Sequence, residues 1–149
     1  MKPNPMSRLS LPSGLAGAPP TVLVVEDDAM VRQACAMMLE DNGFHVVTAV
    51  DGVDGLQKFR QTNPDVVLTD IIMPEKEGIG LIRELRRESS DVKIIAMSGG
   101  GRRSTSDYVS IATALGADAG LYKPFDDLEL VATVRAVLEP AQVAQPMVA

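Results

Sequence analysis

Five side chains that can take part in chemistry stand in or at the ends of four short apolar segments of this sequence. Glu26 and Asp27 come at the end of VLVVEDD, and Asp70 lies inside VVLTDIIMP. Ser98 ends IIAMS, and Lys123 lies inside LYKPF. Three carboxylates, a hydroxyl and an amine together can bind a divalent cation and a phosphoryl group.

The apolar run in each segment does not alternate with polar residues, which is typical of a strand buried on both faces of a parallel sheet. The carboxyl ends of parallel strands meet at one edge of the sheet, and ligands bind there. We therefore expect the five side chains to converge on a single rim.

The rest of the chain supplies the elements that would position them. Strands are expected near 22–25, 45–49, 66–69, 93–97 and 119–122, and helices near 29–42, 53–62, 77–88, 105–115 and 126–139. Asp28 is expected to cap the first helix, while Asn42-Gly43 and Leu115-Gly116 are typical of helix ends. This alternation predicts an α/β fold, a doubly wound five-stranded parallel sheet with five helices in three layers.

Composition indicates one domain over 21–139. Residues 1–20 are rich in proline, serine and glycine and are expected to be a disordered N-terminal segment, while 140–149 are expected to be a short C-terminal tail. No apolar run is long enough to span a membrane, and no signal-peptide pattern is present.

The net charge indicates which kinds of partner to expect, and the cysteine content indicates the cellular compartment. The net charge of −6 argues against a nucleic-acid surface. The single cysteine, Cys35, cannot form an intramolecular disulfide, which favours a cytoplasmic protein. Cys35 has helical spacing with apolar neighbours and is expected in the core, whereas the only histidine, His45, is expected at the surface.

A carboxylate at the rim can attack phosphorus and form an acyl phosphate, and Asp70 is the candidate. A cation must reduce the repulsion between the two anions, and magnesium suits a few carboxylates with retained water. Glu26 and Asp27 would supply ligands, Lys123 a counter-charge and Ser98 a hydroxyl that donates or accepts.

These residues, with Met73-Pro74 after the acidic acceptor and Pro124-Phe125 after the lysine, resemble the pattern of response-regulator receiver domains of the CheY-like, flavodoxin-like type. The resemblance implies that Asp70 is the phosphoacceptor. It also implies that Mg²⁺ is held by Asp27, Asp70 and the backbone carbonyl of Ile72, with Glu26 acting through water. Ser98 and Lys123 would contact the phosphoryl group, and Lys123-Pro124 would be a cis peptide.

The same resemblance implies a single-domain response regulator of a two-component or phosphorelay system, which is not an enzyme beyond assisting its own phosphorylation and slow dephosphorylation. A histidine kinase or histidine phosphotransfer protein would donate the phosphoryl group. A downstream protein would bind the face made by helix 105–115, strand 119–122 and helix 126–139. Neither a direct nucleic-acid partner nor a membrane is expected.

Two positions depart from the family pattern. Gly120 stands where receivers usually have an aromatic residue, with Tyr122 expected on the same face of the strand. Residues 99–103 (GGGRR) are expected to form an unusually long, flexible loop after Ser98.

Three alternatives remain beside this interpretation. A phosphatase or mutase using an aspartyl phosphate would need an acid two residues after Asp70, where the chain has Ile72. A flavin or nucleotide binder would need a glycine-rich loop after the first strand, which here is acidic. The third alternative is a receiver-like module that is never phosphorylated.

Overall fold

The computed structural model of the chain describes residues 18–71, 78–99 and 102–139. Strands and helices alternate as predicted: β1 (Thr21–Val25), α2 (Ala29–Asp41), β2 (His45–Ala49), α3 (Gly52–Thr62), β3 (Val66–Asp70), α4 (Gly78–Glu88), β4 (Lys93–Ser98), α5 (Arg102–Leu115), β5 (Ala119–Tyr122) and α6 (Asp127–Leu138). Of the predicted terminal segments, only residues 18–20 are described, and they are neither helix nor strand.

The helix predicted at 105–115 begins earlier, at Arg102. Arg102 and Arg103 therefore belong to the helix and not to a loop, so the prediction of a loop over 99–103 is wrong at its carboxyl end. The glycines gave a strong loop signal, but the residues after them have no helix breaker that would delay the first turn.

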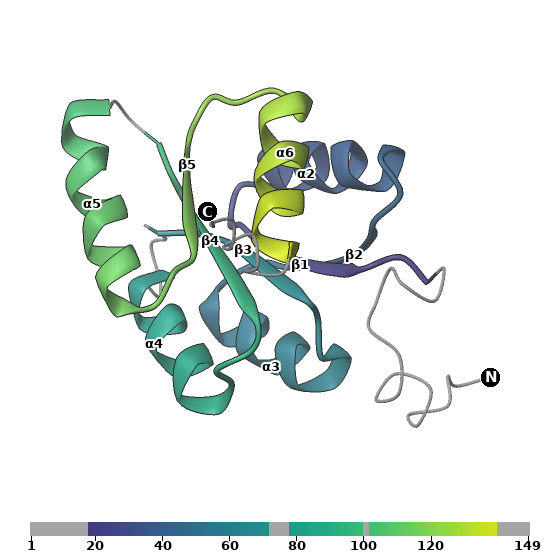
Figure 1. Cartoon of the computed structure of the whole chain (residues 1–149), viewed down its shortest axis with the longest axis horizontal. Helices are drawn as coiled ribbons and strands as arrows, with labels where there is room; N and C mark the ends of the chain where they lie inside the picture. The colour runs from purple at the N-terminus through teal and green to yellow at the C-terminus, as the bar shows by residue number, and fades with distance from the viewer. Residues whose placement is uncertain (1–17, 72–77, 100–101, 140–149) are drawn as a thin grey trace, which may run out of the picture.

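All five strands pair in parallel in one sheet with the order β2-β1-β3-β4-β5, as Figure 1 shows. Val25 pairs with Thr69, Asp70 with Met97, and Ser98 with Tyr122. The carboxyl ends of four strands are thus in register at one edge of the sheet. This register brings together side chains that are far apart in the sequence.

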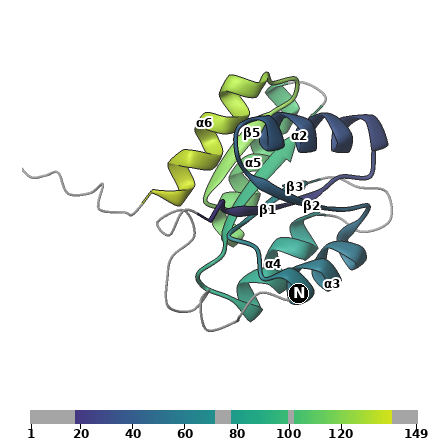
Figure 2. The ribbon, with the colours of Figure 1, turned by 90° about the vertical axis from the view of Figure 1, so that its right-hand side faces the viewer.

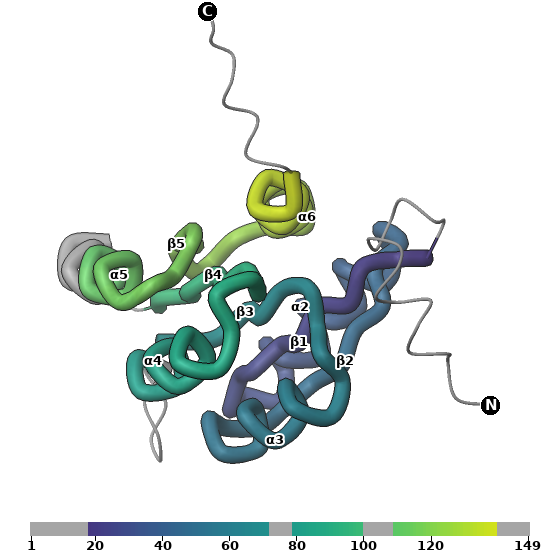
Figure 3. The backbone as a smooth tube through the Cα atoms, turned by 60° about the horizontal axis from the view of Figure 1, so that its bottom comes forward, coloured from purple at the N-terminus to yellow at the C-terminus, as the bar shows by residue number. Residues whose placement is uncertain are grey.

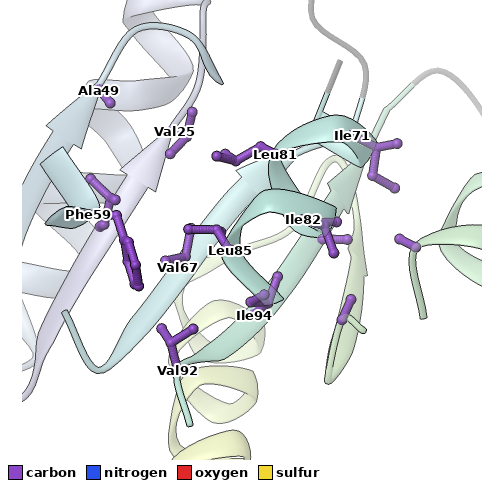
Figure 4. Packing of buried hydrophobic residues seen from close by; sticks show 14 residues of the cluster. Val25, Ala49, Phe59, Val67, Ile71, Leu81, Ile82, Leu85, Val92 and Ile94 are labelled. Atoms are coloured by element: carbon purple, nitrogen blue, oxygen red, sulfur yellow. The ribbon is translucent and has the colours of Figure 1, made fainter. Parts of the chain in front are cut away.

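Helices cover both faces of the sheet, with α2 and α6 on one face and α3, α4 and α5 on the other (Figure 2). Within β1, Leu23 and Val25 pack towards α3 and α4, whereas Val22 and Val24 pack towards α2 and α6. Both faces of the strand are therefore buried, which explains the apolar run without alternation. Figure 4 shows part of the hydrophobic core on the face covered by α3, α4 and α5, where Leu81, Ile82 and Leu85 of α4 contact the sheet.

Local signals set the helix ends that were predicted. The Asp28 carboxylate accepts hydrogen bonds from the Met30 and Val31 amides and caps α2. Gly43 and Gly116 have φ angles of +93° and +126°, which favour glycine after a helix. These turns direct the chain into the next strand, and so the alternation of elements follows from them.

The edge strand β5 lies between α5 and α6 (Figure 3). Gly120 faces α5, and a Cβ atom built on it would lie 2.6 Å from Cγ1 of Val109. Tyr122 is half-buried. Among the described residues, every helix is too short or too polar to cross a bilayer.

Candidate functional site

Three carboxylates meet at the rim of the sheet. Glu26 and Asp27 follow β1, and Asp70 is the last residue of the neighbouring strand β3. One oxygen from each carboxylate lies within 4.8 Å of the others. Glu26 and Asp70 are buried, whereas Asp27 is exposed to solvent.

Lys123 reaches this cluster from the end of β5. Its ammonium group donates to Oε1 of Glu26 at 2.8 Å and to Oδ2 of Asp70 at 3.1 Å. The Lys123 amide also donates to the Ser98 carbonyl at 2.7 Å, which extends the β4–β5 pairing by one residue. The peptide between Lys123 and Pro124 is cis, as the resemblance implied.

Burial and charge act together on the ionisation of this group. Burial raises the pKa of Glu26 above its usual range, and the nearby Asp70 adds to the effect, although the hydrogen bond from Lys123 opposes it. Burial disfavours the Lys123 ammonium, but Glu26 and Asp70 outweigh that effect, so the pKa of Lys123 lies above its ordinary value. Lys123 therefore remains a cation, paired with both Glu26 and Asp70.

Ser98, the last residue of β4, carries a hydroxyl that is buried and has no hydrogen-bond partner in the described part of the chain. A buried polar group without a partner costs about 1–3 kcal/mol. A ligand oxygen bound at the rim would give this hydroxyl an acceptor.

The cluster has the chemistry to hold a hard divalent cation. Its donors are carboxylate oxygens, which magnesium prefers, and the exposed side at Asp27 leaves room for water or phosphate oxygens. The fourth predicted ligand, the carbonyl of Ile72, lies outside the described residues, as does the Met73-Pro74 turn.

One contributor to this region was not predicted from the sequence. Nη1 of Arg32, on the second turn of α2, donates to the backbone carbonyl of Glu26 at 2.8 Å. A basic residue one helical turn beyond the Asp28 cap was the signal that could have indicated it. Among the other predictions, Cys35 is buried and His45 is exposed, as expected.

A profile of the response regulator receiver domain matches residues 22–135, which is most of the chain. The chain belongs to the response regulator receiver domain family. The five-stranded parallel sheet with flanking helices is the fold of this family, and the prediction of a CheY-like receiver is confirmed.

The receiver is similar to transcriptional regulatory protein CseB of Streptomyces coelicolor, with 43% identity over 78% of this chain and 48% of CseB. It is 41% identical to transcriptional regulatory protein PrrA of Mycobacterium leprae over 80% of this chain and 50% of PrrA. Among solved structures it resembles chemotaxis response regulator CheY4 of Vibrio cholerae, with a TM-score of 0.72 and 28% identity, covering 81% of this chain and all of CheY4.

The chain spans about half the length of the curated relatives it matches. These relatives are transcriptional regulatory proteins, and the expectation of no direct nucleic-acid partner is therefore wrong. That expectation was based on the net charge of −6. That charge describes the surface of a receiver and carries no information about the other half of such a regulator.

Proposed function

We propose that this receiver is a phosphorylation switch in which Asp70 accepts a phosphoryl group from a phosphohistidine. The observation that carries the proposal is the position of Lys123, whose ammonium contacts Asp70 and Glu26 at the rim. The buried Ser98 hydroxyl at the same rim has no partner among the described residues. These groups are the acceptor, a counter-charge and a hydrogen-bond donor for one tetrahedral anion.

In the transfer, an oxygen of the Asp70 carboxylate forms a bond to phosphorus while the bond from phosphorus to the imidazole nitrogen of the donor breaks. The electron pair of that bond stays on the imidazole. Lys123 compensates the charge on a phosphoryl oxygen, and the Ser98 hydroxyl donates to another. The product is an acyl phosphate, which water later hydrolyses.

Glu26, Asp27 and Asp70 would hold Mg²⁺, with Glu26 acting through water. When bound, the ion lowers the repulsion between the Asp70 carboxylate and the incoming phosphate. Support for this part of the proposal comes from the 4.8 Å cluster and from the surplus of carboxylates over ammonium groups within it.

The donor would be a histidine kinase or a histidine phosphotransfer protein. An exposed apolar stripe on α2, formed by Met30, Ala34 and Met37, supports contact with a helical partner. Met30 is 80% exposed and lies two residues after the Asp28 cap, close to Asp27 in the chain. Leu128 on the first turn of α6 is also exposed, and α6 packs beside α2.

The output would leave through the face of α5, β5 and α6, because Ser98 and Lys123 end the two strands next to this face. A switch of this kind shifts an existing equilibrium between two conformations. The domain would not act as an enzyme on a separate substrate.

Acetyl phosphate with Mg²⁺ tests the phosphoacceptor, with peptide mass spectrometry to locate the adduct. We expect one phosphoryl group on Asp70 and none on the nearly isosteric Asp70→Asn variant. Asp91→Asn, which changes an exposed carboxylate after α4, should be labelled like the wild type. Labelling of Asp70→Asn at the wild-type level would show that the acceptor is elsewhere.

A further inference from the structure

Asp27 carries the most exposed carboxylate of the site. The Asp27 side chain makes no hydrogen bond with any residue that the structure describes. Its place in the cluster therefore depends on the backbone between Glu26 and Asp28. Whatever holds that backbone also sets the distance between the carboxylates.

Several hydrogen bonds hold this short segment. The Glu26 amide donates to the Ala49 carbonyl at 3.1 Å, which ties the segment to β2. The Glu26 carboxylate accepts from the Asp28 amide at 3.1 Å, and Asp28 caps α2. The Arg32 amide donates to the Asp28 carbonyl at 2.9 Å, and the Lys123 ammonium donates to the Glu26 carboxylate. The Arg32 guanidinium donates to the Glu26 carbonyl at 2.8 Å. Among the described residues, this last contact is the one made by a side chain of the α2 helix.

We propose that Arg32 is a positioning residue for the cation site. This inference rests on the proposed function, because it takes the cluster of Glu26, Asp27 and Asp70 to be a magnesium site. Arg32 lies one turn beyond the cap and is half-buried. It holds the Glu26 carbonyl, and through the backbone it holds the direction of Asp27 towards Asp70. Hydrogen bonds behind metal ligands orient the ligands in this manner.

Arg32 could affect magnesium binding in two ways, through its charge or through its contact with the Glu26 carbonyl, and an experiment can distinguish them. A cation close to the cluster repels Mg²⁺, so removing the charge alone would tighten magnesium binding. Removing a positioning contact loosens the ligands and weakens binding. The two effects have opposite signs, and the direction of the change decides between them.

The test is a calorimetric titration of Mg²⁺ into the wild type and into Arg32→Met, which keeps an unbranched side chain but has no donor. We expect the dissociation constant of the variant to rise about tenfold, the lower end of the range for losing such a contact. Arg32→Lys retains a donor and the charge and should recover part of the affinity. Arg83→Met, an exposed arginine on α4 on the other face of the sheet, loses the same charge and should bind like the wild type.

Amide hydrogen exchange without the metal gives a second measurement. Exchange at Asp27 and Asp28 should accelerate in Arg32→Met and remain unchanged in Arg83→Met. Circular dichroism checks that each variant is folded at the titration temperature.

Equal or tighter magnesium binding by Arg32→Met would overturn the positioning role and leave the phosphorylation proposal intact. A wild type that binds no magnesium would overturn both. Weaker binding with unchanged exchange at Asp27 and Asp28 would also contradict the inference, because the backbone would then not be what Arg32 holds.

Discussion

At the scale of single residues, the site depends on one ammonium group shared by two buried carboxylates. Lys123 contacts both Glu26 and Asp70, and without it two negative groups would face each other away from water. Breaking such a pair by removing one partner is strongly destabilising, since it leaves a buried charge without compensation. A phosphoryl group on Asp70 would attract the same ammonium. Lys123 would therefore compensate negative charge both before and after phosphorylation.

A residue away from the rim gives a prediction about reactivity. Burial raises the pKa of the Cys35 thiol to about 11, and the charge of Glu26 acts in the same direction. The thiolate is the reactive form, so alkylation by iodoacetamide near pH 8 should be about 100-fold slower in the folded protein than in urea. Mass spectrometry of quenched samples measures the rate.

The pH dependence of this effect has a definite sign. Because the folded pKa lies above the unfolded one, the stability contributed by the neutral thiol is complete below about pH 9 and is lost as the pH rises through about 11. Equal alkylation rates for the folded and unfolded chains at pH 8 would contradict the buried placement of Cys35.

At the scale of elements, α5 approaches the edge strand because β5 has no side chain at Gly120. Val109 occupies the space that a Cβ atom on Gly120 would need. Val109 also packs against the core under α5. An aromatic residue at position 120 could not be accommodated while Val109 keeps this place, so the departure from the family pattern is matched by the helix that covers it.

This contact predicts a coupled pair of substitutions. Gly120→Ala should lower the free energy of unfolding by about 1–3 kcal/mol, since the added methyl would lie 2.6 Å from Val109. Adding Val109→Ala should recover part of the loss, although Val109→Ala alone is destabilising. Urea unfolding of the four proteins of this double-mutant cycle measures the coupling.

Simple additivity of the two substitutions would show that Val109 does not fill the space above Gly120. Gly80→Ala on α4 is the matched control, because a Cβ atom there has no neighbour within 4 Å. That substitution should leave the stability unchanged or raise it slightly through the lower entropy of the unfolded chain.

At the scale of the whole molecule, an acidic chain with a net charge of −6 concentrates three carboxylates at one edge of its sheet. Such a cluster destabilises the folded state when no cation compensates it, because like charges at short distance repel. A ligand that binds only the folded state adds stability in proportion to the logarithm of its concentration over the dissociation constant.

Magnesium should therefore raise the melting temperature of the wild type. At a concentration of 100 times the dissociation constant the gain is about 2.7 kcal/mol, and it should be absent in Asp27→Ala. Asp41→Ala, at the exposed end of α2, should respond like the wild type in the same thermal melts. Equal responses of the wild type and Asp27→Ala would place the metal elsewhere.

The sequence by itself determined the order of elements and the identity of the rim residues. Apolar runs ending in Glu26, Asp70, Ser98 and Lys123 are a local signal, as are the caps at Asp28 and Gly116. Such signals are readable because they depend on backbone preferences and burial within a few residues. By contrast, the net charge misled the prediction about nucleic acid, since it describes this chain alone and the matched relatives are about twice as long.

Only the tertiary structure decided which of these groups touch. The strand order places β1 beside β3. Without that order, the distance between the Glu26 and Asp70 carboxylates cannot be predicted. The hydrogen bond from Arg32 to the Glu26 carbonyl is local, and the structure decided only that the side chain makes it. The contact of Lys123 with both carboxylates and the burial of the Ser98 hydroxyl, which has no partner among the described residues, follow from packing between distant segments. The place of Val109 over Gly120 has the same origin: long-range packing depends on the whole sheet, and no short stretch of sequence encodes it.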